Sequence, residues 1–313
     1  MTSSTAPETP GTPRPGGTAP LAGHTVSRVG YGAMQLERLH GDRAAAAALL
    51  RRAVELGVDH FDTAQFYGNG FVNELLRDTL RPEDGAVVVS KVGADPDPHG
   101  PVPLRAAQRP EQLRASVEDN LRSLGTEQIP VVNLRRMDTL PGVLAEGDQV
   151  VDLDDQLAVM TALRDEGKIG AIGLSSVTQD VLRRALPAGI ACVQNAYSLV
   201  ARPDEEMVDL CAAHGIAWVP FFPLGGAFPG MPKVTDEPAV LAASATLDVT
   251  PSQVGLAWLL RRSAGTLLIP GTGDAGHLEQ NVAAGALALS EEFDGVLASL
   301  DAVTSRGADV RLA

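Results

Sequence analysis

The feature that most constrains the fold of this chain is a regular alternation of short apolar runs with longer amphipathic stretches, which begins near residue 26. Each of eight apolar runs has the length of a strand, and each is followed by residues with the hydrophobic spacing of a helix. Eight strictly alternating units within 313 residues fit a (β/α)8 barrel, the TIM barrel, better than a doubly wound α/β sheet. The predicted strands are Arg28–Met34, His60–Asp62, Ala86–Val92, Ile129–Leu134, Ala171–Ser175, Ala191–Gln194, Ala217–Phe222 and Thr266–Pro270.

The N-terminal residues 1–22 differ from the rest of the chain in composition. They are rich in Ser, Thr, Pro and Gly and offer almost no apolar side chains to bury, so we expect a disordered tail. They also lack the basic and apolar regions of a secretory signal. Residues 23–313 are then predicted to form a single domain, the barrel, which carries a further C-terminal helix at Ser290–Ser305.

Charge and cysteine usage exclude several function classes. A formal charge of −14 argues against a nucleic-acid-binding protein, because binding phosphates requires a basic surface. No apolar run approaches the ~20 residues needed to span a bilayer, so we expect no membrane insertion. Cys192 and Cys211 are too few for a disulfide framework and form no CxxC pair, which favours the reducing cytoplasm. The oligomeric state stays open.

Polar and aromatic side chains follow the predicted strands at the points where each strand ends. The carboxyl ends of the strands form one face of a (β/α)8 barrel, and reactive side chains belong there. The six histidines are scattered, so no metal site is predicted. The stretch Gly173–Val177 lacks the last glycine of a GxSxG nucleophile turn. The strand-end residues are Asp62, Lys91, Arg135, Arg136, Ser175, Ser176, Gln194, Asn195, Phe221, Phe222, Gly271 and Thr272.

The segment Gly271–Gly276 reads GTGDAG and matches GxGxxG. Too few residues follow it for a Rossmann domain, whereas the loop after the eighth strand of a barrel can bind phosphate through backbone N–H groups and a helix N-terminus. The alternative is a glycine-rich turn without a ligand. Ser175 and Gln194 can hydrogen-bond a carboxamide, and Phe221 can stack on a flat ring. Together these positions indicate a site for an extended dinucleotide.

Several segments resemble the aldo-keto reductase family. The clearest is Gly57–Gly68, which reads GVDHFDTAQFYG and closely resembles the family signature. The resemblance runs in order from about residue 25 to residue 300, and Val131–Arg135 looks most like the bacterial branch that includes pyridoxal reductases. Further matching segments are Gly30–Met34, Ser90–Val92, Gly167–Ser175, Val193–Asn195, Phe222–Gly225 and Ile269–Thr272.

The resemblance implies reduction of a carbonyl compound with NAD(P)H. By match to the family motif, Tyr67 is the proton donor, and Asp62 and Lys91 are its partners. Hydride addition places negative charge on the carbonyl oxygen, which must be protonated or held by donors. A phenol with a pKa near 10 is a weak acid at neutral pH, and a nearby ammonium is expected to lower that pKa. Lys91 is one of only three lysines among 25 basic residues, which makes its position more telling.

The resemblance also implies a nucleotide site that departs from the family pattern. Many members place Lys and Arg around the 2′-phosphate of NADP, where this sequence has Gly271 and His277. Thr272, the loop N–H groups and Gln280 or Asn281 remain available to that phosphate. We expect NADPH as the cofactor, with NADH as the alternative. The implied cofactor-binding residues are Gly32, Met34, Ser175, Ser176, Gln194, Phe221, Pro223, Leu224, Gly225, Gly271, Thr272, Gly273, His277, Gln280 and Asn281.

A second departure concerns the residue after the fourth strand. Most family members carry a histidine there, and the alignment places Arg135 at that position. Arginine stays protonated, so it can donate hydrogen bonds to a carbonyl oxygen but cannot shuttle a proton. We therefore include Arg135 among the catalytic residues, on the hypothesis that it orients the substrate and helps Lys91 to lower the Tyr67 pKa. The alternative is an arginine that pairs with a carboxylate.

Two classes of function remain at this point. The first is a reductase that converts a small aldehyde or ketone to an alcohol, with pyridoxal or a specialised metabolite as the substrate. The second is a nicotinamide-binding regulatory or sensor subunit with little turnover. The presence of Asp62, Tyr67 and Lys91 together favours the enzyme.

Overall fold

The computed structural model describes residues 14–97, 99, 104–287, 289 and 294–307. At its centre lies a parallel sheet with the strands β3 (Tyr31–Gly32), β4 (His60–Asp62), β5 (Val87–Val92), β8 (Ile129–Arg135), β9 (Ile169–Ser175), β10 (Ile190–Gln194) and β11 (Ala217–Trp218). Their spatial order is β11-β10-β9-β8-β5-β4-β3. The eighth apolar run joins the two edges through parallel bridges, from Thr266 to Trp218 and from Leu268 to Val29. The predicted (β/α)8 barrel is thereby confirmed.

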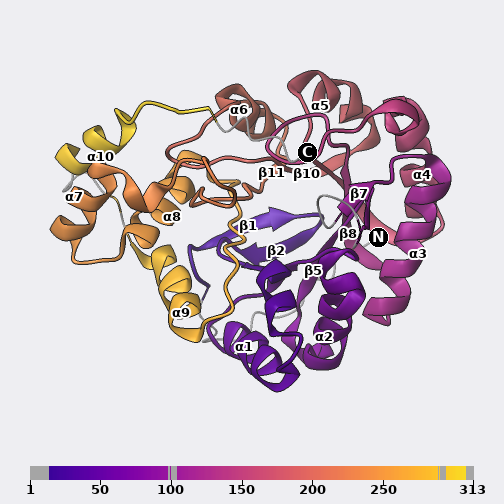
Figure 1. Ribbon diagram of the computed structural model, residues 1–313, viewed down its shortest axis with the longest axis horizontal. Helices are drawn as coiled ribbons and strands as arrows, with labels where there is room; N and C mark the ends of the chain where they lie inside the picture. The colour runs from indigo at the N-terminus through magenta and orange to yellow at the C-terminus, as the bar shows by residue number, and fades with distance from the viewer. Residues whose placement is uncertain (1–13, 98, 100–103, 288, 290–293, 308–313) are drawn as a thin grey trace, which may run out of the picture.

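Helices surround these strands, as Figure 1 shows. Several begin at a side-chain cap: Asp42, for example, accepts a hydrogen bond from the N–H of Ala45, and Thr250 accepts one from Gln253. The C-terminal helix spans Asp294–Asp301 and packs beside α7, and residues 290–293 of its predicted range lie outside the described residues. The helices are α1 (Arg43–Glu55), α2 (Phe71–Thr79), α3 (Pro110–Leu124), α4 (Leu153–Asp165), α5 (Gln179–Ala185), α6 (Glu205–Ala213), α7 (Pro238–Leu247), α8 (Pro251–Arg262), α9 (Ala275–Ala283) and α10 (Asp294–Asp301).

Side chains alternate along each strand between the barrel interior and the helices, as the strand period of two requires. On β8, Val132 and Leu134 pack into the large core beneath the helices, whereas Val131 belongs to a separate interior cluster. Asn133 accepts a hydrogen bond from the thiol of Cys192, an interior residue of β10. The same parity puts the residues at the carboxyl ends, among them Asp62, Lys91, Arg135, Ser175 and Gln194, on the interior side.

An antiparallel hairpin closes the other end of the barrel. It consists of β1 (Thr18–Leu21) and β2 (His24–Ser27). Ala19, Leu21 and Val26 are at most 4% exposed and join the interior cluster. In Figure 1 the hairpin lies across the middle of the strands. The predicted tail is therefore too long: residues 18–21 form a strand, because two alternating apolar side chains suffice to anchor it despite the polar composition around them.

The predicted strands Arg28–Met34 and Ala217–Phe222 are shorter in the structure, and Thr266–Pro270 forms only isolated bridges. Neither the β1–β2 hairpin nor a second hairpin was predicted. Beyond Trp218, Pro220 has no N–H to continue the ladder, although Phe221 N still donates to Asn195 O at 3.0 Å. The additional hairpin, β6 (Ala94–Pro96) and β7 (Leu104–Ala106), stands in the loop after β5. In the described residues, no helix is both long and apolar enough to cross a bilayer.

Candidate active site

The carboxyl ends of neighbouring strands bring Asp62, Lys91 and Tyr67 together. Asp62 ends β4, Lys91 lies on β5, and Tyr67 opens the short 3-10 helix η2 (Tyr67–Gly70). Lys91 Nζ donates a hydrogen bond to Asp62 Oδ1 at 2.5 Å and lies 3.2 Å from the Tyr67 hydroxyl oxygen, to which it also donates. Asp62 is 3% exposed, Lys91 4% and Tyr67 9%. A phenol, an ammonium and a carboxylate thus form one buried network.

The local fold fixes the position of this network. Lys91 Nζ makes its third bond to the carbonyl oxygen of Thr63 at 3.0 Å, so all three of its N–H groups are used. The Thr63 hydroxyl donates in turn to Asn73 Oδ1 on α2 at 2.7 Å. The chain after Tyr67 reverses through Gly68 (φ 58°) and Gly70 (φ 90°), a left-handed conformation that glycine adopts without strain. This turn keeps the phenol beside β4 and β5.

Burial dominates the electrostatics of the phenol. It raises the pKa of Tyr67; Lys91 and Arg135 oppose this rise and Asp62 adds to it, and the net direction is upward. Lys91 and Arg135 do act to lower this pKa, as expected, but burial outweighs them because it penalises the charged phenolate. Burial also disfavours the charged form of Lys91, but Asp62 and Tyr67 outweigh it and raise the Lys91 pKa above its ordinary value.

Amide and hydroxyl groups from β9 and β10 adjoin the network. Gln194 Nε2 donates to Asp62 Oδ2 at 2.8 Å, a bond that the sequence did not reveal. Gln194 Oε1 is buried and has no hydrogen-bond partner among the described residues. The hydroxyl of Ser176 is also buried and has no partner in the described part of the chain, and the neighbouring Ser175 is 1% exposed. A ligand carboxamide would satisfy such orphaned polar atoms, so this end of the site fits the predicted nicotinamide.

Backbone strain gathers at the same face. Residues other than glycine seldom adopt positive φ, and where they do the surroundings must enforce it. Four of the six such residues in the described chain follow the ends of β4, β8, β9 and β11. They are Asn69 (φ 52°), Met137 (φ 59°), Ser176 (φ 53°) and Phe222 (φ 52°).

Arg135 and Arg136 follow one another in sequence and differ in their surroundings. Arg136 Nε donates to Asp138 Oδ2 at 2.8 Å, and its Nη1 donates to Gln156 Oε1 at 2.5 Å. Arg135 Nε is buried without a partner, and Arg135 forms no ion pair with any described residue. Burial lowers the pKa of Arg135 from its ordinary value. Pairing with a carboxylate, the alternative considered for Arg135, is found at Arg136 instead.

The segment after β11 contains the aromatic side chain of Phe221 and the turn that were expected near the cofactor. Phe221 forms a parallel bridge with Ala196, and its ring meets the ring of Phe222 edge-on with centroids 5.0 Å apart. Leu224 O accepts a hydrogen bond from Val234 N at 3.0 Å. Gly225 has a φ of 66°, and a Cβ there would lie 2.0 Å from a backbone oxygen. Phe221, Pro223, Leu224 and Gly225 are all half-buried.

A cavity of about 450 Å³ lies beside the loop after the eighth strand. Asp274 caps α9 by accepting from His277 N at 2.8 Å, and Thr272 Oγ1 accepts from Asp274 N at 3.1 Å. Two predicted contributors do not line this cavity: Gln280 is exposed and Asn281 is buried. The lining residues are Gln35, Arg38, Leu39, Gly271, Thr272, Gly273, Asp274 and His277.

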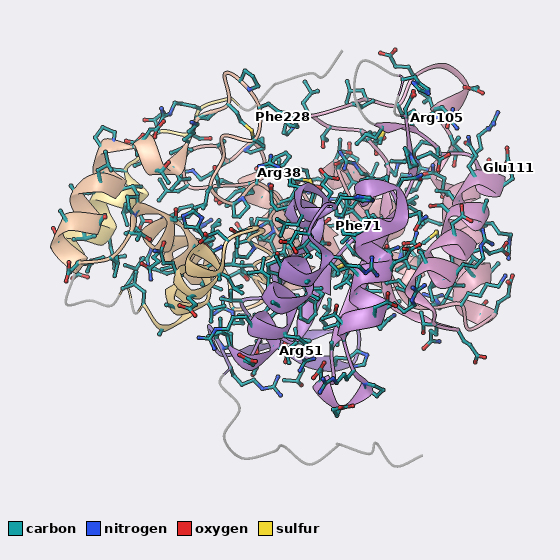
Figure 2. The ribbon with its side chains drawn as sticks, turned by 60° about the horizontal axis from the view of Figure 1, so that its bottom comes forward. Arg38, Arg51, Phe71, Arg105, Glu111 and Phe228 are labelled. Atoms are coloured by element: carbon teal, nitrogen blue, oxygen red, sulfur yellow. The ribbon has the colours of Figure 1, made fainter. Side chains whose placement is uncertain are left out.

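The sequence analysis missed Gln35, Arg38 and Leu39 as lining residues, and Arg38 is the charged one among them. It lies on the 3-10 helix η1 (Ala33–Leu39), directly after the Gly30–Met34 motif, and more than 230 residues before His277 in the chain. Figure 2 shows it on the same side of the molecule as Phe228 in the loop after β11, whereas Arg51 lies at the opposite side. Its position after a recognised motif is the only signal that could have identified it.

Backbone packing accounts for two of the predicted cofactor glycines. A Cβ at Gly32 would lie 2.4 Å from the carbonyl oxygen of Ile269, and one at Gly271 would lie 2.6 Å from the carbonyl oxygen of Gly32. The Tyr31 hydroxyl donates to the backbone oxygen of Thr272 at the same junction. Met34, on η1, is half-buried against the core. Gly32 is thus explained by barrel closure, and Gly271 serves both closure and the cavity.

His60 lies deeper in the barrel, and neither of its ring nitrogens has a hydrogen-bond partner among the residues that the structure describes. It is 1% exposed and packs on Gly30, where a Cβ would lie 2.2 Å from the imidazole. These contacts agree with the packing role expected from its place before Asp62. Within the described ranges, no three His, Cys, Asp or Glu residues gather in a way that could hold a metal ion.

Comparison with known proteins matches this geometry to a family. The model of the Aldo/keto reductase family matches residues 28–302. Pyridoxine 4-dehydrogenase of Escherichia coli is 42% identical over 291 residues, which cover 91% of this chain and 97% of that protein. Probable aldo-keto reductase 1 of Glycine max is 30% identical, with coverage of 86% and 84%.

Solved structures agree on the fold. An aldo/keto reductase from Klebsiella pneumoniae in complex with NADP and acetate is 25% identical, with a TM-score of 0.75 and coverage of 94% of this chain and 98% of that one. An aldo-keto reductase from Bacillus halodurans in its holo form is 21% identical, with a TM-score of 0.72 and coverage of 93% and 98%.

Proposed function

The chain belongs to the aldo/keto reductase family and is an oxidoreductase, and we propose that it reduces the carbonyl group of a small aldehyde or ketone with NADPH. The observation that carries this proposal is the single ammonium of Lys91, which is bonded to both the Asp62 carboxylate and the Tyr67 phenol in a buried site. This network favours turnover over a purely regulatory role, because a sensor needs only the nucleotide-binding residues.

In this mechanism Tyr67 protonates the carbonyl oxygen of the substrate. When bound, NADPH supplies the hydride that the carbonyl carbon accepts. The raised pKa of Tyr67 keeps the phenol protonated before the reaction, so a proton is available at the hydroxyl. As Tyr67 loses that proton, Lys91 at 3.2 Å stabilises the phenolate. Asp62 and Gln194 hold Lys91 in place through a chain of two hydrogen bonds.

The cofactor site divides into two ends. We assign Ser175, Ser176 and Gln194 to the carboxamide end, since two of their buried polar atoms, Ser176 Oγ and Gln194 Oε1, have no partner within the described ranges. We assign the cavity beside Gly271–Asp274 to the phosphate end. There Arg38 supplies a positive charge that the sequence analysis did not anticipate, and this charge favours NADPH over NADH.

The substrate proposal is pyridoxal, with another carbonyl metabolite as the alternative. It rests on the relative named pyridoxine 4-dehydrogenase, whose sequence covers nearly the whole chain at 42% identity. We also propose a cytoplasmic location, because Cys192 and Cys211 are free thiols, and no nucleic-acid partner, because the formal charge is −14.

The test is turnover of an aldehyde panel that includes pyridoxal, followed by NADPH absorbance, with NADH in parallel. The proposal expects oxidation of NADPH with at least one aldehyde and a higher kcat/KM with NADPH than with NADH. Tight NADPH binding without turnover of any member would favour the sensor instead.

A further inference from the structure

Arg135 holds a charge at the mouth of the barrel that no described residue neutralises. It ends β8 with the same parity as Val131 and Asn133, so its side chain starts toward the barrel interior. Its backbone is held tightly: Gln108 Nε2 donates to Arg135 O at 2.7 Å, and a Cβ at Gly93 would lie 2.2 Å from the same oxygen. These contacts hold the end of the strand from which the side chain starts.

The side chain is half-buried, and the described residues provide no counterion for it. Its Nε is buried and unpartnered, and its Nη2 lies 3.6 Å from the position of a Cβ on Gly142, in the loop that follows β8. Arg136 shows the alternative arrangement, since its guanidinium contacts a carboxylate, an amide and a backbone oxygen. Partial burial of an unpaired cation is unfavourable, and an anionic ligand group at this position would offset that cost.

The charges around Tyr67 show what that ligand must carry. Lys91 and Asp62 neutralise one another at 2.5 Å, and the Tyr67 phenol is neutral at ordinary pH. Arg135 is then the excess positive charge, and it acts on both Tyr67 and Asp62. A substrate whose carbonyl oxygen reaches the Tyr67 hydroxyl therefore presents its neighbouring atoms to an unpaired guanidinium.

We infer that this site selects carbonyl compounds with an anionic oxygen on the atom next to the carbonyl-bearing carbon, and that Arg135 binds that oxygen. An aromatic aldehyde with an ionised hydroxyl in the ortho position has this arrangement, and pyridoxal is one example. Arg135 is then a substrate-binding residue that sets specificity. The inference rests on the proposed reductase function and adds the chemistry of the group beside the carbonyl.

The experiment compares two aldehydes that differ in one group. 5-Nitrosalicylaldehyde carries an ortho hydroxyl that is ionised at pH 8, and 3-nitrobenzaldehyde lacks it. The readout is the ratio of their kcat/KM values, measured with NADPH for the wild type, Arg135→Met and Arg135→Lys. Arg105→Met is the control, because Arg105 is 64% exposed and lies on β7.

We expect the wild type to prefer the ortho-hydroxy aldehyde and Arg135→Met to lower the ratio by about 10- to 100-fold, the range for a charge-assisted hydrogen bond. Arg135→Lys should restore part of the preference, and Arg105→Met should leave it unchanged. In the wild type, kcat/KM for 5-nitrosalicylaldehyde should also rise as its hydroxyl ionises, and Arg135→Met should flatten that rise.

Calorimetry with salicylate provides a readout without turnover. The inference expects the holoenzyme to bind salicylate and Arg135→Met to lose at least tenfold in affinity. An unchanged aldehyde ratio in Arg135→Met, or unchanged salicylate binding, would overturn the inference. So would weaker NADPH binding in this variant at an unchanged ratio, since Arg135 would then serve the cofactor. If the wild type reduces no aldehyde, the proposed function fails, and salicylate binding still decides the role of Arg135.

Discussion

The two ends of the barrel interior are built from the same strands with the same side-chain alternation, yet they contain opposite chemistry. At the end closed by the β1–β2 hairpin, Leu21 and Val26 meet Val87 in an apolar cluster. At the other end, the interior positions are occupied by Asp62 and Lys91, which are equally buried but charged. Along one axis the interior changes from a packed core to an ion network within a few residues.

The apolar end of the barrel interior therefore contributes mainly to folding stability, and the charged end contributes mainly to catalysis. The apolar end gains stability in proportion to the area it removes from water, and small changes of volume there are felt directly. The charged end must offset desolvation with hydrogen bonds, and replacing such groups by uncharged ones of similar shape is often nearly neutral for stability. Substitutions at one end should therefore change turnover, and substitutions at the other should change the free energy of unfolding.

The largest expected effect is that of Tyr67→Phe. Removing the proton donor should lower kcat for aldehyde reduction by about 10²- to 10⁴-fold, the usual contribution of general acid catalysis, at a nearly unchanged melting temperature. Tyr197→Phe is the matched control, because Tyr197 is also buried but its hydroxyl bonds Glu205. A Tyr67→Phe enzyme with wild-type kcat would refute the assignment of the charged end as the catalytic site.

Leu21→Ala tests the opposite end. Leu21 is 2% exposed, and its truncation should reduce the free energy of unfolding by about 2–5 kcal/mol as measured by urea denaturation. Activity per folded molecule should stay at the wild-type level. Leu241→Ala, at a side chain that is 46% exposed, should change stability by less than about 0.5 kcal/mol. Loss of specific activity in folded Leu21→Ala would show that the two ends are coupled.

Arg38→Leu tests whether the charged end of the barrel includes a residue from outside the barrel interior, because Arg38 lines the cavity beside Gly271–Asp274. NADP⁺ should bind about tenfold more weakly, since one charge-assisted bond to the 2′-phosphate is lost, and NAD⁺ should bind as before. Fluorescence titration of both nucleotides measures this without turnover. Equal losses for the two nucleotides would place Arg38 near a part of the cofactor that they share.

The smallest expected effect concerns the pH dependence of aldehyde reduction: kcat/KM should not decrease below pH 10. The pKa of Tyr67 is raised, so the phenol stays protonated up to its ordinary pKa of 10 and loses its proton only above it. The kcat/KM for reduction of a non-ionising aldehyde should therefore remain level from pH 6 to 10, and alcohol oxidation should rise over the same range. A fall in reduction with a midpoint near pH 8 would mean that Lys91 and Arg135 outweigh burial.

The sequence by itself determined the alternation of strands and helices and the identity of the side chains at the strand ends. The predicted bounds of β4, His60–Asp62, are those observed, and Lys91 lies in the predicted third strand. These features are local: the period of two along a strand and the spacing of hydrophobic residues along a helix are set by neighbouring residues.

Only the tertiary structure decided how distant groups act on one another. Arg38 reaches the cavity beside Gly271 although more than 230 residues separate them, and Leu21 fills the barrel from within an otherwise polar segment. The upward direction of the Tyr67 pKa and the lack of a described partner for Arg135 Nε likewise follow from burial and from which groups lie within reach. Desolvation and charge pairing depend on three-dimensional neighbours, and a residue pattern along the chain does not contain them.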